Sequence, residues 1–354
     1  MLSLSDTATQ IQAAGRWFLE SGIQEPSGGI ARYYRSDQGQ NAPLSTEITG
    51  YGVSTLLFLH ERTGEAAYRD AALRAAQFLT SVAWDAHLET FPFEVANGPR
   101  FAYFFDCGIT VRGLLAAWRA SGEAGFREVA IAAGRSMLED FRAAGAIHPI
   151  LALPEKRPLA YGPRWSARPG CYQLKAAMAW HDLFRATGED AFLRAYESAL
   201  DQALAGQREF LPGDPNLEKV MDRLHAYEYF LEGLLPVLDR PACADAFRAG
   251  LDRTAGYLRE IAPAFERSDV CAQLLRARLL GEARGLPLDE AAAAQEAARI
   301  ARFQTASGGF LFGRKCGEPM PFVNPVSTAF CVQALALWED RQQGKPRPSR
   351  RLLI

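Results

Sequence analysis

Residues 60–79, HERTGEAAYRDAALRAAQFL, carry the pattern that decides the fold. An apolar segment ends in a tight Thr-Gly-Glu turn, and an aromatic residue, Tyr68, then begins a second, amphipathic segment. The glycine suits the left-handed conformation in which many helices end, and the acidic residue suits the start of the next helix. The stretch therefore predicts two helices joined as a hairpin.

The hairpin pattern repeats along the chain. It returns at residues 118–138 (WRASGEAGFREVAIAAGRSML) and at residues 184–200 (FRATGEDAFLRAYESAL). Weaker copies lie at residues 240–258 and 283–303. A period of about 60 residues with two helices in each unit is typical of an all-helical repeat array.

The expected helices alternate between a polar type and an apolar type rich in Gly, Ala and Leu, as helices packed on several sides are. Polar, outer-type helices are expected near residues 6–20, 65–83, 123–143, 189–209, 242–261 and 287–303. Apolar, inner-type helices are expected near residues 45–62, 106–120, 170–186, 222–238, 267–284 and 325–341.

Six such hairpins predict an all-α fold, a closed (α/α)6 toroid with an inner and an outer helix layer; an open solenoid is the alternative. We expect a single toroid domain over residues 1–343, followed by a basic C-terminal tail over residues 344–354. In a closed toroid the last inner-type helix contacts the first hairpin.

The composition of the 354-residue chain excludes several classes of protein. A formal net charge of −2 argues against a generally basic, nucleic-acid-coating protein. No apolar run approaches the roughly 20 residues that a membrane-spanning helix needs. The start, MLSLSDTATQ, has neither the basic nor the apolar part of a signal peptide, so a cytoplasmic location is expected.

The sequence motifs point to no bound metal or cofactor. None of the six cysteines forms a CxxC pair, and we expect them to be reduced and mostly buried. The HExxH, GxSxG, GxGxxG and P-loop patterns are absent. The sequence points to neither nucleic acid nor a membrane as a partner and leaves the oligomeric state open.

Long links at one end of the hairpins are expected to form the binding surface. They connect outer-type to inner-type helices and are rich in Gly, Pro and aromatic residues. The inner-type helices begin at this end, where their free N–H groups attract anions. The links span residues 21–44, 85–104, 145–168 and 305–323.

The first two inner-type helices begin with carboxylates, which we expect to be catalytic. Glu47 opens the first, with Tyr51 one turn on along the same face as a substrate contact, and Asp106 opens the second. Since packed helices lie about 8–10 Å apart, the two carboxylates are expected at one height and about 5–9 Å apart, as in glycosidases. The alternative is that both only cap their helices. Arg112, nearly two turns deeper, is expected to pair with a carboxylate of the protein or of the substrate.

The fourth inner-type helix has the densest group of ionisable residues. His225, at a polar helix start, can act as a general acid or base, and Glu228 shares its face three residues on. We expect both to be catalytic and Tyr227 to contact substrate; a structural histidine is the alternative.

Further expected substrate contacts lie at other inner-helix starts, where capping is the alternative role. They are Tyr172, Arg267, Asp269, Gln273 and Asn324.

Four segments resemble the α/α-toroid superfamily. They are STEITGYGVSTLLFLHERTG (45–64), FFDCGITVRGLLAAWRASG (104–122), RLHAYEYFLEGLL (223–235) and SDVCAQLLRARLL (268–280). The superfamily includes six-hairpin glycosidases, unsaturated glucuronyl hydrolases, sugar 2-epimerases, terpenoid cyclases and protein prenyltransferases. These segments are most similar to uncharacterised bacterial toroid proteins associated with polysaccharide metabolism. The resemblance covers almost the whole chain and implies the toroid fold, which hosts unrelated chemistries.

The chain departs from several of these relatives. It lacks the DxDD acid of toroid-type terpenoid cyclases, and residues 308–335, which look like the last hairpin of prenyltransferases, offer no His for zinc. Sugar 2-epimerases depend on paired His, whereas among the five His here only His225 begins an inner-type helix.

The resemblance and the candidate residues of the inner-type helices together imply a carbohydrate-active enzyme. Its expected partner is a uronic-acid-containing or other acidic saccharide. The enzyme would act by carboxylate, His or Tyr acid–base chemistry, in glycoside hydrolysis or sugar epimerisation. The alternatives are a non-catalytic saccharide-binding or assembly protein on the same scaffold and, third, a terpenoid cyclase-like enzyme.

Overall fold

The computed structural model describes residues 4–94, 100–143, 145–211, 216–262, 264–345 and 353–354. The chain forms two compact units. Unit 1 comprises Met1–Ile23, Arg32–Ala42 and Leu211–Ile354, and unit 2 comprises Gln24–Ala31 and Pro43–Phe210. The single toroid domain expected over residues 1–343 stays a prediction.

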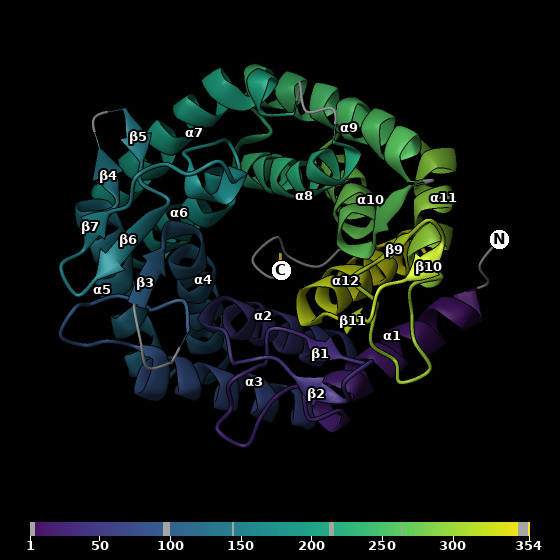
Figure 1. The fold of residues 1–354 in the computed structure, drawn as a ribbon, viewed down its shortest axis with the longest axis horizontal. Coiled ribbons are helices and arrows are strands. Elements are labelled where there is room, and N and C mark those ends of the chain that lie inside the picture. Colours follow the sequence, from purple (N-terminus) through teal and green to yellow (C-terminus); the bar gives the residue numbers. More distant parts are fainter. Residues whose placement is uncertain (1–3, 95–99, 144, 212–215, 263, 346–352) are drawn as a thin grey trace. The chain divides into compact units, whose positions relative to one another are not determined.

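Unit 2 is a two-layered set of three helical hairpins (Figure 1). Its inner row is α2 (Thr46–Thr63), α4 (Phe104–Ser121) and α6 (Gln173–Thr187), in which α4 packs against both neighbours. The outer helices α3 (Ala66–Phe78, extended by a π-helical turn, Leu79–Ala83), α5 (Ala124–Asp140) and α7 (Asp190–Phe210) pack on α2, α4 and α6 in turn.

Unit 1 repeats this arrangement with α8 (Leu217–Leu234), α10 (Ser268–Glu282) and α12 (Pro325–Gln342) as its inner row. The outer helices α9 (Pro241–Ile261), α11 (Glu290–Ala301) and α1 (Leu4–Glu20) pack on α8, α10 and α12. A 3-10 turn, Leu235–Val237, follows α8. The contact of α12 with α1 is the one expected between the last inner-type helix and the first hairpin.

The repeated turn has the predicted conformation at all three of its clear copies. Gly64, Gly122 and Gly188 end α2, α4 and α6 with φ of 75°, 78° and 79°. Each glycine N–H donates to the carbonyl four residues back, at His60, Trp118 and Phe184. Glycine adopts this left-handed conformation without the steric cost that a Cβ atom brings, which suits it to the position.

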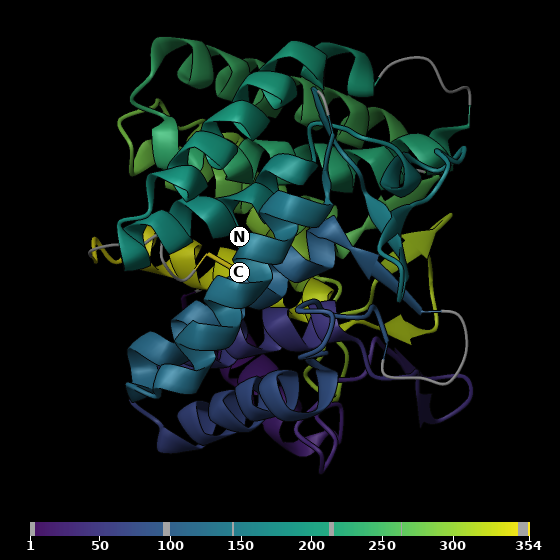
Figure 2. The ribbon, with the colours of Figure 1, turned by 90° about the vertical axis from the view of Figure 1, so that its left-hand side faces the viewer.

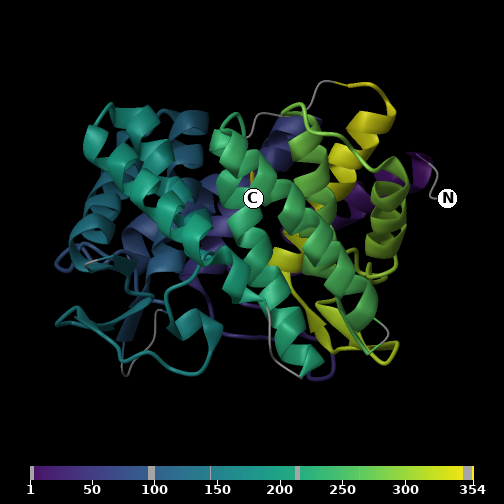
Figure 3. The same ribbon diagram turned by 90° about the horizontal axis from the view of Figure 1, so that it is seen from above.

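Short antiparallel strands lie in the long links, where the sequence carries little strand signal. In unit 1, β1 (Tyr34–Arg35) pairs with β2 (Gln40–Asn41) and with β11 (Phe322–Val323), and β9 (Gly313–Lys315) pairs with β8 (Phe265–Arg267) and β10 (Glu318–Pro319). In unit 2, β6 (Ile150–Leu153) pairs with β3 (Arg100–Tyr103) and β7 (Arg157–Pro158), and β4 (Arg142–Ala143) pairs with β5 (Ala146–Ile147). Figure 2 shows the strands of unit 2 at one end of its helices, and Figure 3 shows the β9–β10 hairpin at one end of those of unit 1. In both units this is the long-loop end, where the inner helices begin.

The starts of α4 and α8, which carry expected catalytic residues, differ from the expected ones. α4 begins at Phe104, two residues before Asp106, so Asp106 lies inside the first turn. α8 begins at Leu217 because Asn216 caps it, accepting hydrogen bonds from the N–H groups of Glu218 and Lys219. His225 therefore lies in the third turn of α8 and not at its start.

Glycines allow the inner helices of unit 2 to approach closely. A Cβ atom at Gly108 of α4 would lie 2.5 Å from the carbonyl oxygen of Ala176 in α6. A Cβ atom at Gly113 would lie 2.7 Å from the carbonyl oxygen of Gly50 in α2. This close contact explains why these apolar helices are rich in glycine.

We expect Gly108→Ala to lower the free energy of unfolding by about 1–3 kcal/mol, because the added methyl group meets backbone that cannot move aside cheaply. Gly256→Ala in α9 is the control, since nothing lies within 4 Å of the added atom. The control should stabilise the protein by about 0.5–1 kcal/mol, the ordinary gain for alanine inside a helix. Denaturant unfolding measures both, and a Gly108→Ala protein as stable as the control would contradict the packing argument.

No helix in the described part of the chain is long and apolar enough to cross a lipid bilayer. Of the predicted basic tail, residues 346–352 lie outside the described residues. The two residues that follow, Leu353 and Ile354, are buried in unit 1.

Candidate functional site

A polar cluster around His225 lies on the inner row of unit 1. The Nδ1 atom of His225 lies 2.6 Å from Oε1 of Gln273 in α10. Two acceptors, Gln273 Oε1 and the Asp269 carboxylate, face Nδ1, which favours a neutral imidazole with its proton on Nδ1 and its lone pair on Nε2. The His225 side chain keeps 12% of its surface exposed, which leaves the ring reachable.

The surroundings keep this histidine neutral. Burial lowers the pKa of His225 to about 4, and although the charge of Asp269 opposes this shift, the charge of Arg267 adds to it. Asp269 Oδ2 lies 3.6 Å from His225 Nδ1. A neutral imidazole with a fixed tautomer is suited to accept a proton at Nε2.

Arg267 and Asp269 form a buried ion pair at the start of α10. Arg267 donates to both carboxylate oxygens of Asp269, over 3.0 and 2.6 Å, and its Nη1 donates to Asp222 over 2.7 Å. Burial alone raises the pKa of Asp269, but the charge of Arg267 holds it below its ordinary value. The Arg267 guanidinium also stacks on the ring of Phe312, 4.4 Å away. Asp269 is therefore a fixed negative charge beside His225.

One turn deeper along the same row lies a second group, which the sequence analysis did not single out. Arg276 of α10 pairs with Glu232 of α8, and its Nη1 donates to Oε1 of Gln333 in α12 over 3.1 Å. Its guanidinium covers the ring of Phe330, 4.1 Å from the centroid. Phe330 in turn lies 6.3 Å from the His225 ring, so the two groups are contiguous.

Glu228, expected to be catalytic, is completely buried in α8. Neither of its carboxyl oxygens has a hydrogen-bond partner in the described residues. Burial raises the pKa of Glu228 well above its ordinary value, and the charges of Glu232 and Asp269 raise it further. The structure therefore places a buried carboxyl group with a raised pKa three residues from His225, without exposed surface.

Two other expected substrate contacts of unit 1, Tyr227 and Asn324, have roles in the fold. Tyr227 is buried on the α9 side of α8, where its hydroxyl lies 3.2 Å from the place of a Cβ atom on Gly250. Asn324 caps α12, since its Oδ1 accepts from the N–H groups of Val326 and Ser327 over 2.8 and 3.3 Å.

In unit 2, Glu47 and Asp106 lie in the first turns of neighbouring inner helices. Gly50 of α2 touches Thr110 of α4, which puts the two carboxylates at about the same height, one turn before this contact. The cap of α2 is Ser45, whose Oγ accepts from the Ile48 N–H, while α4 has no side-chain cap. Neither carboxylate therefore serves as the N-cap of its helix.

The other candidates of unit 2 surround this pair. Tyr172 is buried beside the ring of Phe105, 6.2 Å away, and its hydroxyl donates to the carbonyl of Arg168 over 3.0 Å. Tyr51 is buried in α2, one turn beyond Glu47.

Arg112 has a protein carboxylate as its partner. Its Nε donates to Asp182 of α6 over 3.1 Å, and both side chains are largely buried. Burial alone raises the pKa of Asp182, but the hydrogen bond from His181 and the charge of Arg112 bring it down to about 2. Arg112 thus joins α4 to α6.

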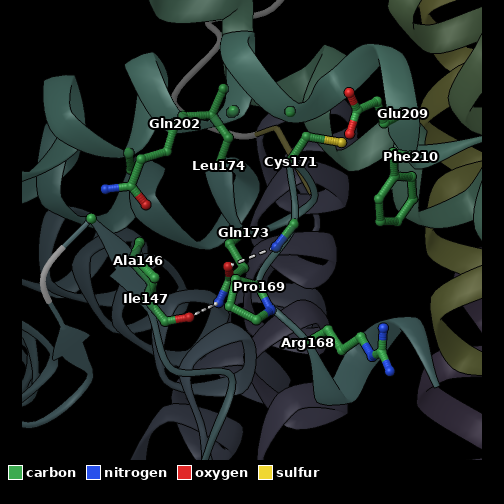
Figure 4. A pocket seen from close by; sticks show the side chains of 15 residues that line it. Ala146, Ile147, Arg168, Pro169, Cys171, Gln173, Leu174, Gln202, Glu209 and Phe210 are labelled. Carbon is green, nitrogen blue, oxygen red and sulfur yellow. Dashed lines mark hydrogen bonds between the residues drawn. The ribbon is translucent and has the colours of Figure 1, made fainter. Parts of the chain in front are cut away.

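A pocket of about 500 Å³ opens at the long-loop end of unit 2 (Figure 4). It lies between β5, the residues that precede α6 and the second half of α7. Gln173 in its wall is fully occupied: its Oε1 accepts from Gly170 N–H and its Nε2 donates to the Ile147 carbonyl, each over 3.1 Å. None of the twelve candidate residues lines this pocket, whose ionisable lining residues are Arg168, Cys171 and Glu209.

Among the described residues, no group of three or more His, Cys, Asp or Glu side chains could hold a metal ion. The side chains of the His225 cluster themselves can transfer protons and stabilise charge.

Comparison with known proteins gives matches in structure only. No protein-family model matches the chain, and no curated protein is similar to it in sequence. A sugar epimerase from a ruminal bacterium matches 98% of this chain and 100% of its own, with a TM-score of 0.74 at 12% identity. The cellobiose 2-epimerase of Spirochaeta thermophila DSM 6192 matches 95% of this chain and 99% of its own, with a TM-score of 0.68 at 17% identity. The unsaturated glucuronyl hydrolase of Bacillus sp. GL1 matches 97% of each chain, with a TM-score of 0.68 at 13% identity.

These likenesses establish the fold. The chain has the (α/α)6 toroid fold, as the repeated hairpin predicted, and the resemblance to α/α-toroid proteins is confirmed at this level. At such low identity the fold alone is shared, and function has to be argued from the site.

Proposed function

We propose that this protein is a carbohydrate-active enzyme that transfers a proton at a saccharide carbon next to a carbonyl or carboxylate group, in epimerisation or isomerisation. The observation that carries the proposal is the 2.6 Å contact between His225 Nδ1 and Gln273 Oε1. It leaves the lone pair of the neutral imidazole on Nε2, where a base is needed.

In this proposal Nε2 of His225 takes the proton from the carbon, and the electron pair moves onto the neighbouring carbonyl or carboxylate oxygen. An isomer forms when the proton returns to the adjacent carbon, the former carbonyl carbon, and the hydroxyl proton of the first carbon moves to the enolate oxygen. An epimer forms when water gives a proton to the first carbon from the opposite face and His225 releases the proton that it took. Asp269, held ionised by Arg267, favours the imidazolium that forms in between, because it lies 3.6 Å from Nδ1. In this proposal Gln273 fixes the tautomer, and Glu228 is the neighbouring carboxyl group of raised pKa within α8.

We propose an acidic saccharide as the substrate. Arg267 donates to Asp222, whose side chain is 52% exposed, so this edge of the guanidinium already binds a carboxylate from the solvent side. A substrate carboxylate can take the place of Asp222 without leaving Arg267 unpaired. The other predicted substrate contacts stay proposals. They are Tyr172, Tyr51, Tyr227, Asn324 and Arg112, whose hydrogen bonds and burial are described above.

The names of the structural relatives agree with this class of reaction. A sugar epimerase, a cellobiose 2-epimerase and a D-mannose isomerase share the fold. Their likeness supports a saccharide as the ligand, while the proton-transfer step rests on the His225 cluster.

The test is incubation in D2O with a panel of neutral sugars and uronic acids, followed by NMR. The proposal predicts deuterium at a carbon-bound position and a new epimer or ketose. Saturable binding without deuterium incorporation would favour the non-catalytic saccharide-binding protein. New reducing ends without carbon-bound deuterium would favour hydrolysis.

Hydrolysis is the second candidate function. It is favoured because Glu47 and Asp106 lie at about the same height in the first turns of α2 and α4. Two carboxylates in adjacent helices suit a glycosidase, in which one is protonated and the other is ionised. An unsaturated glucuronyl hydrolase is among the proteins with this fold.

For this second candidate we expect Asp106→Asn to lower glycoside hydrolysis by about 10²-fold or more, because an amide cannot exchange the proton. The fold should be nearly unchanged, since asparagine is isosteric and Asp106 is not the N-cap of α4. Release of reducing ends and the melting temperature are measured side by side. Full hydrolytic activity in this variant would remove the paired carboxylates from the mechanism.

A further inference from the structure

Leu353 and Ile354 are both buried, and Ile354 contacts the inner row of unit 1. Leu353 keeps 3% and Ile354 keeps 1% of its surface exposed. The backbone N–H of Ile354 donates to Oε1 of Gln333 in α12 over 3.2 Å. Figure 1 shows the C-terminal end on the side of the α8–α10–α12 row that faces away from α9 and α11.

The oxygen that holds Ile354 also holds Arg276. Gln333 Oε1 accepts from Arg276 Nη1 over 3.1 Å, so both N–H groups converge on one atom. The Ile354 nitrogen and Arg276 Nη1 therefore lie no farther apart than these two hydrogen bonds laid end to end. Arg276 and its partner Glu232 have no exposed surface.

This contact lies below the His225 cluster as seen from the long-loop end. Asp269, Gln273 and Arg276 follow one another along α10, so Arg276 is about 4.5 Å farther from the helix start than Gln273. On α12, Gln333 likewise follows Phe330, which lies near the His225 ring. A ligand entering among the long loops reaches His225 first and the C-terminal residues last.

We propose that Leu353 and Ile354 form the floor of the His225 site, closing its deep end and limiting the length of the saccharide that fits. The role of the floor rests on the proposed function, whereas the docking of Leu353 and Ile354 rests on their burial and on the hydrogen bond of Ile354 alone. Apolar side chains suit this position, because they keep water from a buried ion pair without offering it a competing partner. The segment ending at Ile354 would then set specificity from the side opposite the entrance.

The docking is tested with thiol chemistry, which needs no activity. Cys316 is the exposed native thiol, and the other five cysteines are buried, so Cys316 gives the reference rate. In Ile354→Cys the new thiol should react with a disulfide reagent more slowly than Cys316, by about 10²-fold or more, because a thiol reacts only when exposed. In the matched control Lys345→Cys, at an exposed residue, it should react at the Cys316 rate. Equal rates for the two introduced thiols would overturn the docking.

The floor is tested with a ladder of acidic oligosaccharides from one to six sugar units. Wild type should lose turnover beyond a fixed length, and a chain ending at Lys345 should shift that limit upward, raising turnover of the first excluded length at least about tenfold. The double variant Leu353→Ala/Ile354→Ala, in the full-length chain, should shift it in the same direction if the shortened chain does not fold. An identical length profile in every variant that folds would overturn the floor. If no saccharide is turned over by any of them, the proposed function fails together with the length limit, and the thiol rates still decide the docking.

Discussion

His225→Asn should lower the rate of the proposed proton transfer by about 10²–10⁴-fold, the range of general acid–base catalysis. The asparagine Nδ2 takes the position of the histidine Nδ1, so it can still donate to Gln273 Oε1. The substitution therefore removes the Nε2 base and keeps the neighbouring hydrogen bond. Deuterium incorporation from D2O measures the rate, and the melting temperature should stay nearly unchanged.

The control for this variant is His60→Asn. His60 lies at the far end of α2, where its Nδ1 contacts the Glu65 carbonyl over 2.9 Å. Its replacement should leave turnover as in the wild type. Full deuterium incorporation by His225→Asn would exclude His225 as the base.

The pH dependence follows from the lowered pKa of His225. As the base has to be neutral, the wild-type rate should be flat at neutral pH and fall as the pH drops toward about 4. In the unfolded chain this histidine titrates near its ordinary pKa of about 6.5. The unfolded state therefore binds the proton first, so His225 makes the protein less stable as the pH falls from about 6.5 to about 4. His225→Asn should flatten this part of the stability curve.

The fold could be predicted because its signals are local. Each Thr/Ser-Gly-Glu turn forms its own hydrogen bonds, and Gly64, Gly122 and Gly188 need no distant partner to end a helix. The short strands gave no such signal, because they have only two to four residues each and some of them pair with segments far away, as Tyr34 does with Val323. Pairing of this kind depends on the folded loops and not on strand propensity.

The candidate site could be predicted only in part. His225, Asp269 and Gln273 were singled out because ionisable and polar groups in the apolar inner-type helices are visible in the sequence, and the structure brings these three together. Arg276 and Glu232 were missed, although a charge within the apolar runs QLLRARLL and YFLEGLL is itself a signal. A charged side chain in a buried helix has to find a partner, but the sequence does not tell on which helix that partner lies.

The buried ion pair of Arg276 and Glu232 leads to the second prediction with a large effect, a loss of stability. Arg276→Met should lower the free energy of unfolding by about 3–5 kcal/mol, because it leaves Glu232 buried without the cation beside it. Methionine fills much of the same volume, so a cavity contributes little to the loss. Denaturant unfolding followed by circular dichroism measures the change. Arg135→Met is the control: its partner Glu189 is 38% exposed, and this surface pair should contribute no more than about 1 kcal/mol.

The double variant Arg276→Met/Glu232→Gln separates charge from packing. If the loss in Arg276→Met comes from an uncompensated carboxylate, neutralising Glu232 should restore a large part of the stability. A double variant less stable than Arg276→Met would show that the guanidinium acts through packing on Phe330 and its bond to Gln333. The first outcome would mean that Arg276 is retained to neutralise Glu232, which places a balanced charge pair directly beneath His225 and beside Ile354.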